Sequence, residues 1–527
     1  MYSTRSEQHW DTVFPCYVSR SRTIDEMFCT AVSKAAARIA VVDRDVRITY
    51  SDLDRRVSAL ALGLSSRGVA PRDRVAVMLP NGWEAVLSVL AIARLGAIAV
   101  PIGVRLRRAE VGYMFSDCEP KALIYEAAFE AELPQPSDAG PEASMRFCVG
   151  PSATQAPAFA SLLASEGTLA TCPAVEDDTF GILYTSGTTG RPKGAMLTHL
   201  GAVHSCLHWA ERLRLGGNES AILCIPWSQV AGLCGVVLPF LSLGGRLVVM
   251  REFKRREFLE LAARESITHA LLVPAMYGLC LLEPDLASFD LSHWRLGVYG
   301  SAPMPEATIR RFAEAVPHLV MCNAYGATET TSPATIMPPG EGIAHSDSIG
   351  KTVTCGEIRV MDERGNEVAP GETGELWIRG PMIVPGYWRN PEANTASFVA
   401  GFWKSGDIGS VDADGYVRIA DRKKDMINRG GFKVYPAEVE NVITDHPQTI
   451  EAAVVGRKDD ILGERVVAFV RATDGRLGEA EIKAFCAERM ADYKVPDRVV
   501  VDINPLPRNA NGKIQKDELR AVAEQQR

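Results

Sequence analysis

Residues 184–194 read Tyr-Thr-Ser-Gly-Thr-Thr-Gly-Arg-Pro-Lys-Gly and follow an apolar run that contains Phe180, Ile182 and Leu183. Glycine lets a backbone turn tightly and approach a ligand closely. Consecutive exposed amides, hydroxyls and a lysine form a concave site for phosphate oxygens. A flexible surface loop is the alternative interpretation. Because cations lie inside the cluster and a buried-type strand precedes it, we expect a loop that binds nucleotide phosphates.

The spacing of this loop differs from that of a Walker A motif, in which glycine directly precedes the lysine and a hydroxyl residue follows it. Here Arg191 and Pro192 precede Lys193, and Gly194 follows it. A proline inside the loop also disfavours direct continuation into a helix. We therefore do not expect the chemistry of a P-loop ATPase.

The composition is typical of a globular enzyme. A length of 527 residues predicts about two to four domains, and 46% hydrophobic with 23% charged residues is ordinary. A net charge of -8 gives no support to nucleic-acid binding. The 12 cysteines form no Cys-x-x-Cys pair, so neither a zinc ribbon nor a disulfide framework is indicated. Reduced thiols and a cytoplasmic location are expected.

Two apolar segments resemble membrane spans, but each is interrupted. Residues 85–104 contain Arg94 and Pro101, and residues 230–245 contain several glycines and Pro239. Both fall short of the roughly 20 continuous apolar residues that a span requires. The N-terminus carries Arg5 and Glu7 before any apolar run and lacks a signal-peptide pattern. We expect no transmembrane segment.

Alternating helix and strand patterns occupy residues 24–150 and 220–325, which predicts parallel α/β layers. Within them, residues 131–158 are rich in Pro, Ala and Ser and suggest a surface excursion, and residues 233–243 suggest a helix. Shorter β-rich pieces follow from about residue 350 to 420, and roughly 100 residues of α+β pattern complete the chain. The expected fold is α/β, with a large N-terminal domain (1–422, including the β-rich subdomain) and a small C-terminal domain (423–527).

Further polar stretches lie at the ends of predicted strands, where open α/β sheets place their ligands. Residues 300–303, Gly-Ser-Ala-Pro, form a small-residue turn suited to a flat ring such as adenine, or a plain turn. In residues 325–330, Glu329 is suited to hold Mg²⁺ and Thr328 to bind phosphate. A solvated glutamate is the alternative.

Four charged positions have weaker individual signals. Asp407 lies at a predicted turn, where its carboxylate is suited to accept hydrogen bonds from ribose hydroxyls. Alternatively, Asp407 only forms the turn. Arg422 and Lys424 belong to a basic run near a predicted domain boundary, which is usually a solvated patch. Lys513 is presented by a polar loop and, taken alone, predicts an exposed charge.

The order of these motifs resembles that of the adenylate-forming superfamily, which contains acyl-CoA synthetases, nonribosomal adenylation domains and luciferases. The resemblance covers about residues 24 to 520. It depends on Tyr184–Gly194, Gly300–Pro303, Tyr325–Glu329, Gly374–Leu376, Trp403–Asp407, Asp421–Glu440 and Gly512–Lys513.

The resemblance implies a role for each matching residue. The ATP phosphate loop would comprise Thr185, Ser186, Gly187, Thr188, Thr189, Gly190 and Lys193. The adenine pocket would comprise Gly300, Ser301, Ala302, Pro303, Asn323, Ala324 and Tyr325. The remaining contacts would be Thr328 and Glu329 to phosphate and Mg²⁺, Asp407 and Arg422 to ribose, and Gly430 and Gly431 to the pantetheine arm. Lys424 resembles the hinge of a mobile C-terminal domain, and Lys513 the lysine that enters the site for adenylation.

By this resemblance the chain is expected to be an ATP-dependent carboxylic acid–CoA ligase that uses ATP, Mg²⁺ and coenzyme A. A carboxylate would attack the α-phosphorus of ATP, and the CoA thiol would then attack the acyl-adenylate. Charge neutralisation and alignment must dominate such a reaction between anions. The expected partners are the small-molecule acid, ATP and CoA, without nucleic acid, and a homodimer is left open.

The acyl pocket departs from the usual pattern of the superfamily. Gln229 stands where many members have histidine, and Asn428 replaces a lysine found in some aryl-CoA ligases. Tyr299 would shorten or cap the pocket, or is simply a strand-end aromatic. The candidate walls are Trp227, Gln229, Val230, Val237, Tyr299, Ser301, Gly326, Ala327 and Ser332. They are mostly apolar and include no arginine, which favours a medium-length aliphatic or ring-containing acid over a short dicarboxylate.

Three other functions compete with this one. A stand-alone adenylation enzyme would load a carrier protein, but no carrier domain follows the basic C-terminal stretch. A luciferase-type oxygenase shares these motifs and would consume O₂. A binding protein without activity is disfavoured because Lys513, Glu329 and the phosphate loop are all present.

Overall fold

The computed structural model describes residues 2–165, 167, 174–185, 192–302, 304–422, 425–430, 432–459, 461–509 and 512–525, without the side chain of Arg422. The chain forms two compact units. The first comprises Met1–Ala302, Arg311–Ile358 and Ile378–Lys404, and the second Pro303–Arg310, Arg359–Trp377 and Ser405–Arg527. The expected α/β class, with a large N-terminal and a smaller C-terminal part, is confirmed. The boundary expected at residues 422–423 stays a prediction, and Lys424 lies outside the described residues.

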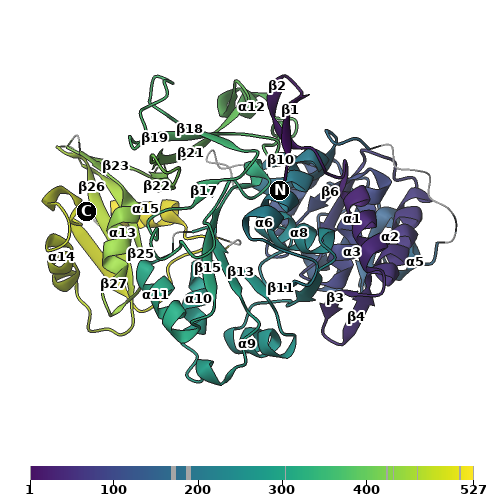
Figure 1. Ribbon diagram of the computed structural model, residues 1–527, viewed down its shortest axis with the longest axis horizontal. Coiled ribbons are helices and arrows are strands. Elements are labelled where there is room, and N and C mark those ends of the chain that lie inside the picture. Colours follow the sequence, from purple (N-terminus) through teal and green to yellow (C-terminus); the bar gives the residue numbers. More distant parts are fainter. Residues whose placement is uncertain are drawn as a thin grey trace. The chain divides into compact units, whose positions relative to one another are not determined.

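A six-stranded sheet in the first unit carries the phosphate-loop motif at its edge. Its order is β10-β9-β6-β5-β7-β8, and only β10 runs antiparallel to its neighbour. Helices α1, α2 and α3 pack together beside it (Figure 1). The strands are β5 (Arg74–Met78), β6 (Ile98–Pro101), β7 (Ala122–Glu126), β8 (Arg146–Val149), β9 (Thr179–Thr185) and β10 (Lys193–Thr198). The helices are α1 (Ile24–Ala35), α2 (Tyr50–Ser65), α3 (Trp83–Leu95), α4 (Arg108–Cys118) and α5 (Ala160–Leu163).

The second sheet of this unit has nine strands in the order β17-β16-β15-β14-β13-β11-β12-β3-β4. Its central strands from β15 to β3 are parallel, so their carboxyl ends meet at one edge. The strands are β3 (Ile39–Asp43), β4 (Val46–Thr49), β11 (Ser220–Leu223), β12 (Arg246–Val249), β13 (His269–Leu272), β14 (Leu296–Gly300), β15 (Val320–Tyr325), β16 (Thr335–Ile336) and β17 (Lys351–Thr352). The helices are α6 (His199–Arg212), α7 (Val230–Gly232), α8 (Leu238–Ser242), α9 (Arg255–Arg264), α10 (Pro274–Cys280) and α11 (Glu306–Ala315), of which the part up to Arg310 belongs to the second unit.

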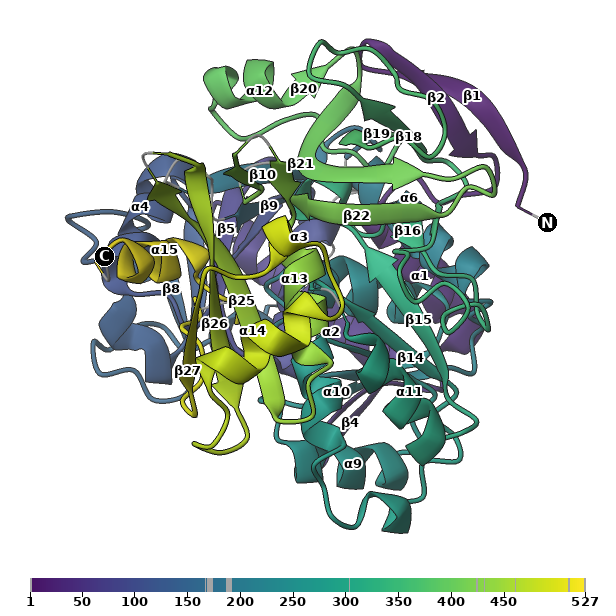
Figure 2. The same cartoon turned by 90° about the vertical axis from the view of Figure 1, so that its left-hand side faces the viewer.

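The second unit contains a sheet that is covered by helices on both faces. Alternate side chains of β25 separate two cores: Val454 packs with α13 and α14, whereas Ala453 and Val455 pack with α15. Strands β25, β26 and β27 and these helices are labelled in Figure 2. The elements are β23 (Ile427–Arg429), β24 (Phe432–Val434), α13 (Pro436–Thr444), β25 (Thr449–Asp459), β26 (Gly463–Ala472), α14 (Glu479–Ala487), β27 (Arg498–Asp502) and α15 (Lys516–Gln525).

The remaining elements are mostly short strands. An antiparallel hairpin, β1 (Thr4–His9) and β2 (Thr12–Tyr17), precedes the sheets and was not expected from the sequence. The region between the large sheets and the C-terminal residues contains β18 (Glu357–Met361), β19 (Gly374–Arg379), α12 (Pro391–Ser397), β20 (Phe398–Val399), β21 (Phe402–Val411) and β22 (Val417–Arg422).

One local expectation was wrong. Residues 131–158 are not only a surface excursion, because they include the sheet strand β8, and Arg146 there is buried and donates to the carbonyl oxygens of Pro134 and Pro141. The helix expected over residues 233–243 is confirmed as far as Ser242, but its first part, Leu233–Val237, is a π-helical turn that precedes α8. Such turns add a residue to the helix and are frequent near functional sites.

Two general expectations concern thiols and membranes. All eleven cysteines in the described part of the chain are free thiols. Within that same part, every helix is too short or too polar to traverse a lipid bilayer.

Candidate active site

The phosphate-loop motif joins the two strands of a hairpin. Thr185, the last residue of β9, pairs with Lys193, the first residue of β10. A Cβ atom on Gly194 would lie 2.6 Å from Ile182 Cγ2, so only glycine fits against β9 there. Residues Ser186–Gly190 lie outside the described residues. The described ends therefore fix where the loop leaves and rejoins the sheet, and a strand rather than a helix follows it.

Three aromatic residues anchor the ends of the loop. Tyr113 Oη donates to the carbonyl oxygen of Pro192 at 3.0 Å, and Tyr184 Oη donates to Asp117 Oδ2 at 2.5 Å. Burial, together with the nearby Cys118 and Asp117, raises the pKa of Tyr184. Its phenol therefore remains protonated and can donate. The backbone amide of Trp388 donates to the carbonyl oxygen of Gly194 at 2.7 Å.

Lys193, Tyr387 and Glu329 form a cluster beside this anchor. Tyr387 Oη donates to Glu329 Oε1 at 2.8 Å, and both side chains are buried. Lys193 Nζ lies 5.2 Å from the centre of the Tyr387 ring, within cation–π range. An isolated bridge between Ala195 and Tyr387 aligns the two segments. The expected phosphate and Mg²⁺ residues thus share one aromatic neighbour.

Sequence reasoning did not identify Tyr387. It follows Gly386 in a Pro-Gly-Tyr-Trp stretch, which resembles an ordinary turn, and lies 58 residues from Glu329. Burial and the Glu329 carboxylate raise the pKa of Tyr387, so the phenol stays protonated. Only the pairing of distant segments reveals the contact.

The two expected adenine segments lie side by side on neighbouring strands. Gly300 of β14 pairs with Ala324 of β15, and Tyr299 pairs with Asn323. A Cβ atom on Gly300 would lie 2.3 Å from the Ala324 carbonyl oxygen, so glycine is required for this approach. Ser301 has a φ of +67°, which re-aims the chain as it leaves the sheet. Ala302 follows this turn, and Pro303 lies outside the described residues.

A small cavity of about 40 Å³ lies next to these segments in the first unit. Five of the expected acyl-pocket residues line it, together with Trp209, Ala231, Leu271, Gly300 and Ala324; the five are Val230, Tyr299, Ser301, Gly326 and Ser332. Trp209 belongs to α6, and the spacing of apolar residues along this helix does not distinguish a pocket wall from a core residue. Gly235 of the π-helical turn leaves room for the Trp209 ring and Leu271.

Other expected wall residues have different surroundings. Trp227 is buried, and its Nε1 donates to the carbonyl oxygen of Leu79 at 2.7 Å. Gln229 is half-buried and directly precedes α7, where its backbone carbonyl oxygen accepts a hydrogen bond from the amide of Leu233. Ala327 precedes the 3₁₀ turn Thr328–Thr330. Trp227, Gln229, Val237 and Ala327 are not among the cavity-lining residues, and their contact with substrate stays a prediction.

The second unit contains the other expected ligands. Asp407 of β21 is buried and pairs with Arg422 of β22, so the two expected ribose contacts start from opposite positions on antiparallel strands. Gly430 has a φ of +59°, and its amide donates to the carbonyl oxygen of Leu462 at 2.6 Å. Gly431 lies outside the described residues.

Lys513 is exposed on a tight turn of the second unit. Its backbone amide donates to Asn509 Oδ1, and its carbonyl oxygen accepts from Asn509 N. Arg508 and Ile514 form a β-bridge that closes the turn. The turn therefore holds the backbone of Lys513 in place while exposing the side chain.

Comparison with known proteins identifies the family. Residues 28–388 match the AMP-binding enzyme family, and residues 438–513 match its C-terminal domain. The chain belongs to the AMP-binding enzymes of the adenylate-forming superfamily. Like its relatives, it is an AMP-forming acid–thiol ligase.

Named relatives and solved structures share most of their length with this enzyme. The long-chain-fatty-acid–CoA ligase of Mycobacterium tuberculosis is 34% identical, covering 90% of this chain and 93% of the relative. The indoleacetate–CoA ligase of Aromatoleum aromaticum has the same identity and coverage. ATP-bound MatB from Rhodopseudomonas palustris superposes with a TM-score of 0.86 at 31% identity, covering 95% of this chain and 99% of MatB.

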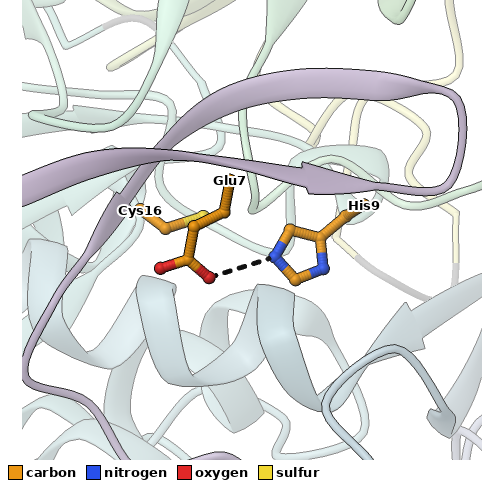
Figure 3. Close-up of side chains that lie close together, drawn as sticks. All are labelled: Glu7, His9 and Cys16. Atoms are coloured by element: carbon orange, nitrogen blue, oxygen red, sulfur yellow. Dashed lines mark ion pairs between the residues drawn. The ribbon is translucent and has the colours of Figure 1, made fainter.

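One further cluster of polar side chains in this AMP-binding enzyme has a composition that metals favour. Glu7, His9 and Cys16 lie on the β1–β2 hairpin, with ligand atoms within 4.8 Å of one another (Figure 3). However, Arg20 donates to both Glu7 oxygens at 2.9 and 2.7 Å, which holds the pKa of Glu7 far below its usual range. Burial raises the pKa of the Cys16 thiol to about 12, and the thiolate is the form that binds metals.

This cluster therefore fastens the hairpin rather than binding a metal. The side chain of Arg20 is fully buried, and it joins Glu7 of β1 to Glu176, which precedes β9. Removing one partner of such a buried pair leaves an uncompensated charge, whereas the intact pair fixes the geometry of both segments.

Proposed function

We propose that this enzyme is an ATP-dependent carboxylic acid–CoA ligase that works through an acyl-adenylate. The observation that carries the proposal is the cluster of Lys193, Tyr387 and Glu329 at the base of the phosphate loop. It combines a cation, a buried carboxylate and a fixed donor at one place. The relatives named above are CoA ligases, which supports CoA as the thiol.

In the first half-reaction a substrate carboxylate attacks the α-phosphorus of ATP and releases pyrophosphate. Two anions must approach one another, so the residues have to neutralise charge and align the reactants. Lys193 and Thr185 would hold the pyrophosphate portion, and Thr328 would bind a phosphate oxygen. Lys513 would stabilise the charge on the attacking carboxylate oxygen and on the oxygens of the pentavalent α-phosphorus.

The nucleoside would be held by the remaining residues. The small-residue turn after β14 would accept the adenine ring, with Asn323, Ala324 and Tyr325 beside it. Asp407, a buried carboxylate, would accept hydrogen bonds from the ribose hydroxyls, with Arg422 on the adjacent strand.

The donor set around Glu329 fits a magnesium ion, because Mg²⁺ prefers carboxylate oxygens and phosphate oxygens over nitrogen or sulfur. When bound, Mg²⁺ would supply positive charge to the phosphate oxygens. Tyr387 orients the Glu329 carboxylate through its hydrogen bond. A solved relative, an o-succinylbenzoate–CoA synthetase, was crystallised with ATP and magnesium ion.

In the second half-reaction the CoA thiol attacks the carbonyl carbon of the acyl-adenylate and AMP leaves. This step does not require Lys513, because no pentavalent phosphorus forms. We therefore propose that Lys424 is the hinge at which the C-terminal part reorients between the steps. Gly430, with its positive φ, and Gly431 would leave room for the pantetheine arm.

The acyl group is proposed to be medium-chain aliphatic or ring-containing. Relatives of similar identity act on acids as different as long-chain fatty acids, indoleacetate and ferulate, so family membership alone does not select one. The small, mostly apolar cavity beside Tyr299 and Gly326 favours a compact group.

ATP–pyrophosphate exchange over a panel of carboxylic acids tests the proposal, followed by detection of the CoA thioester. We expect acid-dependent exchange and thioester formation with free CoA. Absence of exchange with every acid would overturn the proposal. One relative is a fatty acid–acyl-carrier-protein ligase, so acyl transfer to a phosphopantetheinyl carrier but not to CoA would instead support carrier loading.

A further inference from the structure

The cavity beside the adenine segments is bordered by two aromatic residues that carry hydrogen-bond donors. Trp209 of α6 and Tyr299 of β14 both line it, and each side chain is only 1% exposed. Trp209 Nε1 and Tyr299 Oη have no hydrogen-bond partner among the residues that the structure describes. Neither atom reaches bulk water, so each would pay the cost of desolvation without compensation in the ligand-free enzyme.

These two side chains are exceptions among the most deeply buried tyrosines and tryptophans, although His208 and His269 also have buried ring nitrogens without a partner in the described residues. Eight tyrosine and tryptophan side chains in the described residues are less than 2% exposed. Six of them have a partner for their polar atom: Tyr17, Tyr50, Tyr125, Trp227, Tyr277 and Trp294. The two without a partner are the two that line the cavity.

An unsatisfied buried polar group in a folded protein calls for an explanation, and a ligand is one such explanation. The indole N–H can only donate, and a neutral phenol donates as readily as it accepts. Burial raises the pKa of Tyr299, so its hydroxyl keeps its proton. The complementary ligand atom is therefore a hydrogen-bond acceptor.

The other lining residues restrict the shape and charge of that ligand. Val230, Ala231, Leu271, Ala324 and Gly326 are apolar, and none of the lining residues in the described part of the chain carries a formal charge. The hydroxyl of Ser205 donates a hydrogen bond to the carbonyl oxygen of Ser332, so this oxygen already has a donor within the protein. A second carboxylate would be left uncompensated here, whereas a neutral oxygen such as a ketone or ether would be satisfied.

We propose that the acyl substrate is a compact ring acid with a neutral acceptor oxygen remote from its carboxylate, and that Tyr299 and Trp209 bind this oxygen. The inference rests on the proposed ligase function and specifies its substrate class. Trp209 and Tyr299 are then specificity-determining residues. They favour the oxygenated acid and disfavour an apolar analogue, because that analogue leaves both donors unpaired.

Paired acids of nearly equal size test this inference in ATP–pyrophosphate exchange. Suitable pairs are para-methoxybenzoate with para-ethylbenzoate, and para-acetylbenzoate with para-isopropylbenzoate. In the wild-type enzyme, kcat/KM should favour the oxygenated member of at least one pair by about 10²-fold or more, since sites built to hydrogen-bond a substrate strongly reject analogues that lack the group. Tyr299→Phe and Trp209→Phe should each reduce this ratio by about tenfold or more.

Tyr50→Phe is the matched control. Tyr50 is equally buried, but its hydroxyl donates to the carbonyl oxygen of Gly245 at 2.7 Å. This variant should lower the melting temperature and leave the substrate ratio unchanged. Tyr299→Phe should not lower the melting temperature, because it removes a donor that has no partner.

The possible outcomes distinguish a failure of the substrate inference from a failure of the proposed ligase function. Equal kcat/KM within both pairs, unaltered by Tyr299→Phe, would overturn the inference while exchange itself upheld the ligase proposal. A fall in melting temperature for Tyr299→Phe as large as for Tyr50→Phe would also count against it, because the hydroxyl would then have a partner in the protein. If no acid supports exchange, both proposals fail.

Discussion

Tyr387→Phe is predicted to raise the Mg²⁺ concentration that adenylation requires, while leaving the fold largely intact. The substitution removes only the phenol oxygen, which donates to Glu329 Oε1 at 2.8 Å. The ring remains, so the contact with Lys193 at 5.2 Å is preserved. The phenol oxygen also takes part in side-chain hydrogen bonds with Trp403 and Ser397, so the perturbation is confined to the groups around this oxygen. Among them, Glu329 is the expected magnesium ligand.

The magnitude follows from the burial of this hydrogen bond. Tyr387 is 5% and Glu329 8% exposed, so water does not readily replace the lost donor. Hydrogen bonds to charged groups contribute about 1.5–3 kcal/mol. Substitution of groups that orient a metal ligand typically costs 10–100-fold in metal affinity or activity. We therefore expect the Mg²⁺ concentration for half-maximal exchange to rise about 10–100-fold.

Exchange rates measured across a Mg²⁺ titration provide the assay, with thioester formation from supplied acyl-adenylate as an internal comparison. Tyr387→Ala should add a defect in pyrophosphate binding, because it also removes the ring beside Lys193. Tyr50→Phe loses a buried hydrogen bond elsewhere and should show wild-type Mg²⁺ dependence. If Tyr387→Phe also shows wild-type Mg²⁺ dependence, Tyr387 supports only the fold and the orientation argument is refuted.

Three further predictions concern other parts of the enzyme. Lys513→Ala should lower adenylate formation by about 10²–10³-fold, the scale of one lost electrostatic contact, and largely spare thioester formation from acyl-adenylate; equal loss in both steps would contradict the two-step assignment. Gly300→Ala should destabilise the fold by about 1–3 kcal/mol, because its Cβ would lie 2.3 Å from a carbonyl oxygen of β15. Gly216→Ala, with open space around its Cβ, is the control in urea unfolding, and equal stability of the two variants would be the contrary result. Acidification below pH about 6.5 should destabilise the fold, since burial lowers the pKa of His204 and His269 to about 3 and the unfolded chain then binds protons that the folded chain does not. The loss should reach about 1.4 kcal/mol per pH unit for each histidine, and His269→Leu should reduce the slope measured between pH 7 and pH 5; an unchanged slope would contradict the assignment.

The sequence located two candidate adenine-binding segments at strand ends, and the structure agrees with that location. Gly300 pairs with Ala324, and Tyr299 with Asn323, on adjacent parallel strands. Nucleotide binding by these segments stays a prediction. The α13 helix begins at Pro436 and ends at Thr444, because proline favours the first turn and the apolar spacing continues through the helix. Hairpin β1–β2 was missed, because its alternation is weak and its stability depends on the buried Arg20, which joins Glu7 of β1 to the distant Glu176.

By itself the sequence determined which residues are candidates for the chemistry, because glycine, hydroxyl, lysine and carboxylate groups at fixed local spacing reflect backbone geometry that is encoded locally. The phosphate loop, the small-residue turn at Gly300 and the exposed Lys513 are of this kind. The tertiary structure decided which side chains meet. Tyr387 reaches Glu329, and Trp209 joins Tyr299 at the cavity, only because strands and helices distant in sequence pack together. Such contacts depend on long-range packing, and no local spacing specifies them.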